Sequence, residues 1–409
     1  MLSPKTIEIV KQTVPFLREH REQITTLFYE QMFQEHPELY NIFNITHQKE
    51  KSQPRALADT VYAAAANIDD LSSILPVVKR IAYKHRSIGV QPDQYPIVGK
   101  HLLAAIKEVL GDAATDEILN AWKETYQVLA DVFIEVEKDM YKQANEQAGW
   151  QLFRDFLVVK KVKESDVITS FYLQPTDGEK LAPFQPGQYT SVKVHVPGQP
   201  YEQIRQYSLS ASPHSDTYRI SVKREEGRNG HPEGLISSYL HDHIKEGSIL
   251  PITPPAGDFV LDQEIDTPVV LLAGGVGITP LMSMFETLLK TQPQRPVTLI
   301  HATINGSVQA FKKQIEQASQ LPQVNIHFCY EQPTEQDELH PLFSKKGYID
   351  EEWLRTIVPT VEADFYFCGP VPFMRAVKQA LENMEVAPER IHYEFFGPAL
   401  QIESEAVQN

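Results

Sequence analysis

The chain has 409 residues, a formal net charge of −16 and a sequence pI near 5.4. This negative charge repels phosphate, so nucleic acid and anionic membranes are not expected as partners. A hydrophobic content of 42% supports large cores, and the length suggests two or three domains. No apolar run approaches the roughly 20 residues that span a bilayer, and the N-terminus does not resemble a signal peptide. We therefore expect a cytoplasmic protein without membrane insertion.

The cysteine content limits the redox chemistry. Cys329 and Cys368 are the only two cysteines, and both lie in apolar, strand-like runs. Two thiolates are too few for an ordinary iron–sulfur cluster or a cysteine-rich zinc site. Any electron transfer must therefore use organic or haem cofactors.

Residues 1–147 have the periodicity of helices. Apolar residues recur at steps of three and four in the stripes Trp122–Met140, Ile97–Leu110 and Leu57–Ala66. No convincing strand pattern occurs in this part of the chain. We predict an all-α domain over residues 1–147.

Residues 151–262 change to a period of two. Tyr218, Ile220 and Val222 alternate with Arg219 and Ser221, and turn clusters rich in proline and glycine separate such runs. This pattern is typical of antiparallel strands of which one face is buried. We predict a small antiparallel β-barrel.

Residues 267–409 show a third pattern, in which apolar strands alternate with helices. Pro268–Ala273 is a continuous apolar strand followed by glycines. Thr279 is then predicted to be the N-cap of a helix, with Pro280 at its first position. Strands of this kind are buried on both faces, so we predict a parallel α/β domain.

Three short segments of the β and α/β parts point to cofactor chemistry: Arg205-Gln206-Tyr207-Ser208, Gly274-Gly275-Val276-Gly277-Ile278-Thr279-Pro280 and Cys368-Gly369-Pro370. The glycine segment lies between a strand and a helix, where backbone N–H groups bind phosphate. Taken singly, the glycines indicate a tight turn as well, and the arginine segment an ordinary strand. In this order the three resemble the ferredoxin–NADP reductase-like flavoproteins.

That resemblance implies the residues of two cofactor sites. FAD would be bound by Tyr189, Arg205, Gln206, Tyr207, Ser208 and Ser237. The nicotinamide dinucleotide would be bound by Gly274, Gly275, Val276, Gly277, Ile278 and Thr279, with Cys368, Gly369 and Pro370 beside the nicotinamide. The segment near the C-terminus would lie beside the flavin ring through Glu394, Phe395, Phe396, Gly397 and Pro398.

His85 is the candidate metal ligand of the helical part. It continues an apolar helix face that begins at Ile74 and steps through Val78 and Ile81. A lone histidine on such a face is more often a core residue than a ligand. Together with Pro37, Phe43, Gln53, Leu57 and Lys84, His85 forms a pattern that resembles a globin. In a globin, His85 would be the proximal haem ligand.

With both resemblances combined, the whole chain resembles the flavohaemoglobins of bacteria and yeast. This implies Tyr29 as the distal tyrosine and Gln53 as the distal polar residue. Leu57 would restrict the haem pocket, Phe43 would pack on haem, and Lys84 would contact a propionate or lie toward the flavin. The alternative is that Tyr29 is a core residue and Gln53 a solvated one.

Glu137 and Tyr95 are predicted to complete the proximal side. Glu137 lies on a mostly apolar stripe between Phe133 and Met140, where a carboxylate is costly without a partner. A ligating histidine needs an acceptor for its second ring N–H, and a carboxylate makes the imidazole a stronger donor. Glu135 lies off the stripe and is expected to be solvated.

The family resemblance implies a nitric oxide dioxygenase. Electrons would pass from NADH or NADPH through FAD to haem b, where nitric oxide and dioxygen form nitrate. The segment His301–Gly306 has no arginine for a 2′-phosphate, which favours NADH. A haem-based sensor and a general flavin reductase are the alternatives. We expect a monomer, and a lipid in the haem pocket is left open.

Overall fold

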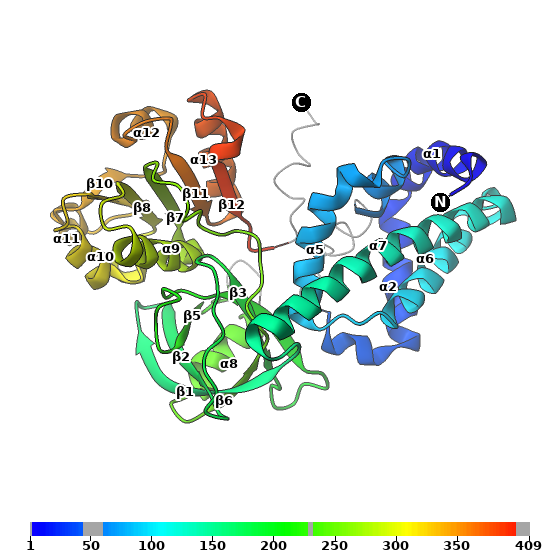
Figure 1. The fold of residues 1–409 in the computed structure, drawn as a ribbon, viewed down its shortest axis with the longest axis horizontal. Coiled ribbons are helices and arrows are strands. Elements are labelled where there is room, and N and C mark those ends of the chain that lie inside the picture. The colour runs from blue at the N-terminus through cyan, green and yellow to red at the C-terminus, as the bar shows by residue number, and fades with distance from the viewer. Residues whose placement is uncertain (1, 44–59, 228–231, 398–409) are drawn as a thin grey trace. The chain divides into compact units, whose positions relative to one another are not determined.

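The computed structural model describes the chain except residues 1, 44–59, 228–231 and 398–409 (Figure 1). Gln53, Leu57 and Pro398 therefore lie outside the described residues. The chain divides into two compact units, residues 1–153 with 193–205 and residues 154–192 with 206–409. The domain boundaries drawn from the sequence stay predictions. No helix in the described part is both long and apolar enough to cross a membrane.

The N-terminal part is helical, as predicted. Its elements are α1 (Pro4–Glu19), α2 (Arg21–Glu35), η1 (Pro37–Asn41), a helix at 60–66, η2 (Leu71–Ile74), α5 (Leu75–Ile88), α6 (Gln94–Leu110), η3 (Gly111–Ala113) and α7 (Asp116–Ala148). Ser3 and Thr115 cap the N-termini of α1 and α7 through their hydroxyl oxygens. Gly89 and Gly149 end α5 and α7 in the left-handed conformation, where a Cβ would be strained.

The helices of this unit pack in pairs. α2 packs on α6, and α7 packs on both α1 and α5. Phe28, Met32 and Trp122 lie in the main core, where the Trp122 indole N–H donates to the Thr13 hydroxyl at 2.8 Å. Because of these pairings, residues of α5, α6 and α7 lie close together, and residues of α2 lie close to α6.

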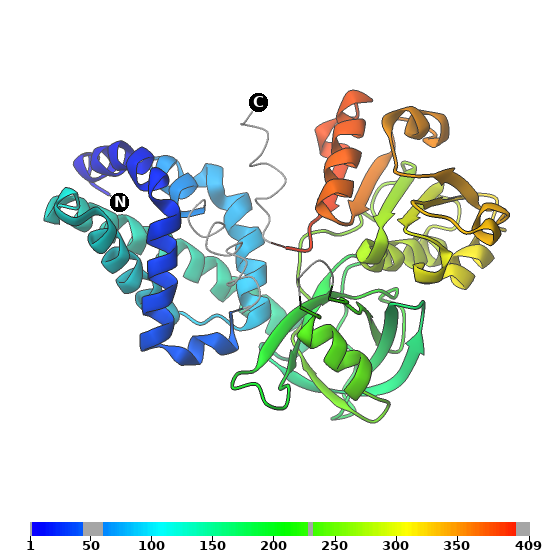
Figure 2. The same cartoon turned by 180° about the vertical axis from the view of Figure 1, so that it is seen from behind.

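An antiparallel sheet follows the helical part in the chain (Figure 2). Its elements are β1 (Arg154–Lys163), β2 (Ile168–Pro175), β3 (Tyr189–Val194), β4 (Gln203–Ser208), β5 (Tyr218–Lys223), α8 (Leu235–His243) and β6 (Ile249–Ile252). The strand order is β4-β3-β6-β1-β2-β5. An antiparallel bridge between Leu209 and Ile220 joins the end of β4 to β5, so the sheet closes as the predicted barrel.

A six-stranded parallel sheet follows, in the order β10-β9-β8-β7-β11-β12. Its elements are β7 (Val269–Gly274), η4 (Gly275–Gly277), α9 (Ile278–Thr291), β8 (Val297–Thr303), η5 (Gly306–Val308), α10 (Lys312–Ala318), β9 (Val324–Tyr330), α11 (Glu335–Glu338), β10 (Phe343–Lys346), α12 (Glu351–Ile357), β11 (Asp364–Cys368), α13 (Val371–Asn383), η6 (Pro388–Arg390) and β12 (Ile391–Glu394). The predicted order of all-α, antiparallel β and parallel α/β parts is confirmed.

Helices cover both faces of the parallel sheet (Figure 1). Val269 and Leu271 of β7 face a core shared with α9 and α10. Val270 and Leu272 face a second core shared with α12 and α13. Because successive side chains of a strand point to opposite faces, the continuous apolar run of β7 is what this arrangement requires.

The predicted start of α9 is wrong by two residues. The helix begins at Ile278 with Gly277 as its N-cap, and the Thr279 hydroxyl donates to the Val276 carbonyl at 3.0 Å. Thr279 is therefore inside the first turn, and Pro280 occupies the third helical position. The glycines form a 3₁₀ turn that continues directly into α9, so no side-chain cap precedes the helix.

A buried ion pair joins the barrel to the parallel α/β part within the second unit. Arg219 of β5 and Glu286 of α9 approach to 2.7 Å between Nη2 and Oε1, and both side chains are buried. Glu286 also accepts hydrogen bonds from the Ser212 backbone at 2.9 Å and from Gln314 Nε2 at 2.7 Å. Arg219 can be buried on the polar face of β5 because the Glu286 carboxylate compensates its charge.

We expect Glu286→Leu to destabilise the second unit by about 3–5 kcal/mol, because it leaves the Arg219 charge buried without its partner. The double variant Arg219→Met/Glu286→Leu should regain part of this loss. Urea unfolding followed by circular dichroism measures both. Glu382→Ala, which breaks the exposed Lys378–Glu382 pair, is the control and should cost under about 1 kcal/mol. A midpoint for Glu286→Leu equal to that of the control would refute this role.

Candidate functional site

Three helices of the first unit bring His85, Tyr95 and Glu137 together. His85 Nδ1 lies 2.7 Å from Glu137 Oε1, and the Tyr95 hydroxyl donates to the same oxygen at 2.6 Å. A carboxylate oxygen only accepts, so the Nδ1 of His85 carries the proton. Burial, together with the negative charge of Glu137, raises the pKa of Tyr95, which keeps its hydroxyl protonated as a donor.

The local sequence explains this convergence. Val78 and Ala82 are buried on the face of α5 that His85 continues. Phe133, one turn before Glu137 on α7, lies with its ring centroid 5.9 Å from that of His85. Glu137 is 2% exposed, whereas Glu135 is exposed as expected. Glu137 is therefore buried because it lies on the apolar stripe of α7.

The opposite nitrogen of His85 is open. The side chain is 31% exposed, and its Nε2 has no hydrogen-bond partner among the residues that the structure describes. Because Nδ1 is protonated toward Glu137, Nε2 carries the lone pair. An imidazole anchored by a carboxylate at one nitrogen and open at the other has the arrangement of a metal-ligating histidine. The residues present therefore fit a haem iron at Nε2.

Tyr29 and Phe43 also lie together. Tyr29 on α2 is buried, stacks on Phe33 with centroids 5.7 Å apart, and meets Phe43 edge-on at 5.9 Å. Phe43 follows η1 and is half-buried. Lys84 is half-buried next to His85 on α5. The roles of these three residues stay predictions.

The predicted FAD residues occupy three places in the barrel part. Tyr189 starts β3, and its backbone pairs with Ala256 through hydrogen bonds of 2.9 and 2.8 Å. Two residues earlier, Gly187 has φ +107°, and a Cβ there would overlap the Phe259 carbonyl oxygen, so only glycine fits. Ser237 lies in the first turn of α8, where its hydroxyl donates to the Gly234 carbonyl at 3.1 Å.

The arginine segment forms the end of β4. Arg205, Gln206 and Tyr207 are half-buried, and Ser208 is buried. Arg205 Nη1 donates to the Ile204 carbonyl at 2.8 Å. Partial exposure of three successive polar and aromatic side chains on a strand agrees with a ligand-binding strand, and their individual roles stay predictions.

The glycine segment packs against Cys368-Gly369-Pro370. A Cβ at Gly277 would overlap the Cys368 carbonyl oxygen, and one at Gly274 would lie 3.0 Å from Pro370. Gly275 has φ +54°, which favours glycine. Val276, Ile278 and Thr279 complete the turn between β7 and α9. The two segments can approach this closely only because Gly274 and Gly277 carry no Cβ at the contact.

The register of the parallel sheet gathers the remaining predicted residues at one edge. Ala273 lies opposite Cys368, and Cys368 lies opposite Glu394. The carboxyl ends of β7, β11 and β12 therefore meet, and ligands of open α/β sheets bind at this edge. Complete burial raises the pKa of the Cys368 thiol well above its usual value, so no thiolate forms there. Beyond β12, Phe395 lies against Gly397, and Phe396 is 46% exposed.

His301 is a supporting residue that the sequence reasoning did not identify. It is fully buried in β8, and its Nε2 donates to the Gly275 carbonyl at 3.1 Å. Burial lowers its pKa to about 4, so the ring stays neutral. Gln309, which accepts from the Tyr330 hydroxyl, lies on the other side of the ring. His301 thereby stabilises the glycine turn through a hydrogen bond from β8. A histidine inside an apolar strand was the available signal.

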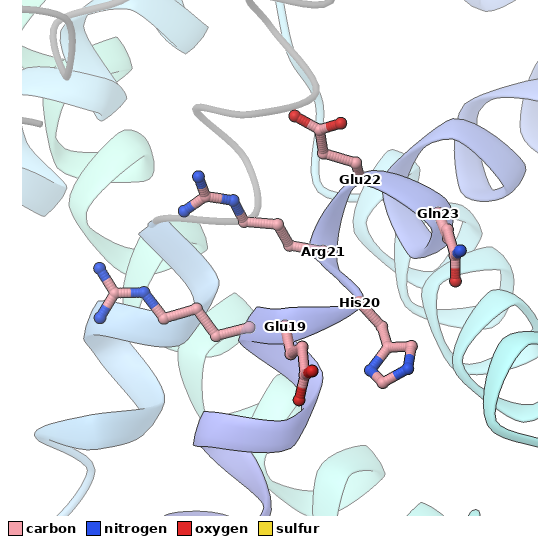
Figure 3. A pocket seen from close by; sticks show the side chains of 6 residues that line it. Glu19, His20, Arg21, Glu22 and Gln23 are labelled. Atoms are coloured by element: carbon pink, nitrogen blue, oxygen red, sulfur yellow. The ribbon is translucent and has the colours of Figure 1, made fainter.

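A surface hollow at the junction of α1 and α2 is not a convergent site. Residues 18–23 line it, and Figure 3 shows that the side chains of His20, Arg21 and Gln23 leave the chain in different directions. A ligand site needs polar groups aimed at one point. We assign no function to this hollow.

Comparisons with known proteins agree with this arrangement. A globin family model matches residues 26–133, an oxidoreductase FAD-binding domain model matches 155–261, and an oxidoreductase NAD-binding domain model matches 271–379. A flavohemoprotein of Halalkalibacterium halodurans is 56% identical over 97% of both chains. One from Bacillus subtilis is 51% identical over 98% of this chain and 99% of its own.

Solved structures give the same result. The flavohemoglobin of Malassezia yamatoensis, which holds FAD and heme, has a TM-score of 0.81 at 29% identity and covers 97% of this chain and 100% of its own. The FAD/NAD-binding domain of a nitric oxide dioxygenase from Vibrio cholerae has a TM-score of 0.55 at 36% identity, over 60% of this chain and 99% of its own.

The fold and the site define an oxidoreductase with a haem-binding globin domain, an FAD domain and an NAD domain. More particularly, the chain belongs to the flavohemoproteins, whose members match it over nearly its full length. The predicted family and cofactors are confirmed.

We expect His85→Ala to lose haem and to retain FAD and NADH-driven reduction of an artificial electron acceptor, because His85 belongs to the first compact unit and the FAD and NAD domains lie mainly in the second. An absorbance spectrum and an acceptor assay measure these effects. Glu135→Gln is the control and should keep haem. Retention of haem in His85→Ala would exclude His85 as the ligand, and loss of FAD would show that the units are not independent.

We expect Gly277→Ala to slow flavin reduction by NADH by about 100-fold, because the added Cβ displaces the turn from Cys368 and a shift of about 1 Å has an effect of this size. Stopped-flow reduction of the bound flavin measures the rate. Haem and FAD content should not change. Gly178→Asn, in an open turn at φ +76°, is the control and should leave the rate unaltered. An unaltered rate in Gly277→Ala would contradict the proposed dinucleotide turn.

Proposed function

We propose that this flavohemoprotein is a nitric oxide dioxygenase. The overall reaction would use the two electrons of one NADH to convert two nitric oxide and two dioxygen molecules into two nitrate ions, with FAD and haem supplying the one-electron chemistry. The contact of His85 with Glu137 carries the proposal, because a carboxylate acceptor favours chemistry on oxygen over reversible oxygen carriage. The name of the Vibrio cholerae relative supports it.

The proximal residues set the donor strength of His85. Haem, when bound, supplies an iron centre where dioxygen is reduced by one electron and combines with nitric oxide. Glu137 accepts the Nδ1–H of His85, which fixes the ring orientation and makes Nε2 a stronger donor. The Tyr95 hydroxyl holds Glu137 in place through its own hydrogen bond of 2.6 Å.

Tyr29 would act on the distal side. A phenolic O–H aimed at negative charge that develops on oxygen stabilises the transition state. Phe33 and Phe43 hold the Tyr29 ring from two sides, so the hydroxyl keeps a defined direction. Gln53 and Leu57, outside the described residues, would assist and would restrict the pocket.

The reductase part would deliver the electrons. Two roles are assigned to the segments at the edge of the parallel sheet: the glycine turn at 274–279 binds the dinucleotide phosphates, and Cys368–Pro370 contacts the nicotinamide. The remaining residues are assigned to FAD: Tyr189, Arg205, Gln206, Tyr207, Ser208, Ser237, Glu394, Phe395, Phe396, Gly397 and Pro398. The lack of an arginine in His301–Gly306 favours NADH over NADPH.

One measurement separates this function from a sensor and from a general flavin reductase. Steady NADH oxidation by the purified holoenzyme should require both nitric oxide and dioxygen, with one NADH consumed for two nitric oxide molecules. A sensor would show no sustained turnover. A flavin reductase would oxidise NADH equally fast without nitric oxide.

We expect Tyr29→Phe to lower nitric oxide turnover by at least about tenfold, because one well-aimed donor to developing negative charge contributes about 3 kcal/mol. Oxygen dissociation should also become faster. Phenylalanine keeps the ring packing on Phe33 and Phe43, so loss of the core does not complicate the result. Stopped-flow spectroscopy separates the oxygen step from flavin reduction, which should stay unchanged.

The control for this variant is Tyr141→Phe. Tyr141 belongs to the same helical unit, and its hydroxyl donates to the Val90 backbone carbonyl at 2.8 Å. Its removal should leave nitric oxide turnover unaltered. If Tyr29→Phe matched this control in turnover and oxygen release, Tyr29 would be a core residue without a catalytic role.

A further inference from the structure

A second candidate metal site lies where α2 ends against α6, and the function above does not use it. Glu35 and His36 close α2, and His101 lies in the middle of α6. One ligand atom from each of these three residues lies within 4.8 Å of the others. The described part of the chain contains no other group of three or more histidine, cysteine or acidic residues this close together.

His101 is the anchor of this group. Its side chain is 2% exposed, and its Nε2 is buried without a hydrogen-bond partner among the described residues. The nearest carboxylate oxygen, Glu35 Oε2, is 3.6 Å away, too far for a hydrogen bond. Buried polar groups without partners are rare in proteins, and an unobserved ion or water is a common explanation for one.

The other two side chains face the same point. The rings of His36 and His101 lie edge to face with centroids 5.6 Å apart, and Glu35 Oε2 approaches His101 Nε2. Two imidazoles and one carboxylate suit zinc and similar transition metals, whereas calcium and magnesium prefer oxygen ligands alone. Three protein ligands leave a fourth tetrahedral position for water. We propose that Glu35, His36 and His101 form a site for a divalent transition metal such as Zn²⁺.

Binding requires a small rearrangement that the exposed side chains permit. Zinc–ligand bonds of about 2.0–2.1 Å place tetrahedral ligand atoms about 3.4 Å apart, closer than the present spacing. His101 is held by burial, whereas the Glu35 and His36 side chains are 53% and 28% exposed. To close on His101, Glu35 must leave Lys100, and the Nδ1 of His36 can keep its contact with Glu38 Oε1 at 3.1 Å while Nε2 turns to the metal. Metal binding therefore requires only side-chain movement at the end of α2.

Lys100 competes with the metal for Glu35. Its Nζ lies 2.6 Å from Glu35 Oε2, so a lysine charge already occupies the position that a cation would take. The Lys100 side chain is 62% exposed and can turn into solvent. Removing this charge should therefore strengthen metal binding, which a purely structural ion pair would not do.

Equilibrium dialysis of the holoenzyme against Zn²⁺, followed by metal analysis, tests the site. We expect one zinc per chain in addition to the haem iron, and no comparable binding of Mg²⁺. His36→Asn and Glu35→Gln should each weaken zinc binding by at least about tenfold, since even residues behind the ligands of metal sites have effects of this size. His20→Asn, which removes a half-buried histidine of the same unit, is the control and should not change the affinity.

Lys100→Met should tighten zinc binding, the opposite sign to the ligand variants. His101→Asn tests the anchor, and because this residue is buried, the two exposed ligand variants give the result if that variant does not fold. Zinc should also raise the melting temperature of the natural chain and not that of His36→Asn, because a ligand of the native state alone stabilises it. Failure to bind zinc, or binding that survives both His36→Asn and Glu35→Gln with unchanged affinity, would overturn the proposal. An unchanged affinity in Lys100→Met would remove Glu35 from the ligand set.

Discussion

The carboxylate of Glu137 is the group on which the helical site depends. It is 2% exposed, and one of its oxygens accepts from both His85 and Tyr95. A charge at this depth is tolerated only because two donors compensate it. In return, the carboxylate fixes the tautomer of His85 and leaves Nε2 open. One interaction thus links the packing of α5, α6 and α7 to the chemistry that His85 can perform.

The reductase part depends on close backbone approach at the edge of its parallel sheet. Gly277 packs on the Cys368 carbonyl, and Gly274 packs on Pro370. His301 supports the same turn from within β8 by donating to Gly275. The buried pair of Arg219 and Glu286 then joins this sheet to the barrel. Contacts from β8 and from residues 368–370 therefore fix the position of the glycine turn.

Much of this protein follows from the sequence because its signals are local. Periods of 3.6 and 2 depend only on which face of a helix or strand is buried, so the three parts could be predicted in order. The glycine turn was predictable because it lies between an apolar strand and a helix. Glu137 could be distinguished from Glu135 because one carboxylate lies on the apolar stripe of α7 and the other does not.

The sequence by itself determined the three structural patterns and the family, and it supplied the candidate residues of the main sites. Only the tertiary structure decided which distant groups meet: Glu286 with Arg219, His301 with Gly275, and His101 with Glu35 and His36. It also decided that α9 begins at Ile278 and not after Thr279. The physical reason is common to all of these. A buried polar side chain is stabilised by partners from other elements, and the spacing of residues along the chain carries no record of which elements pack together.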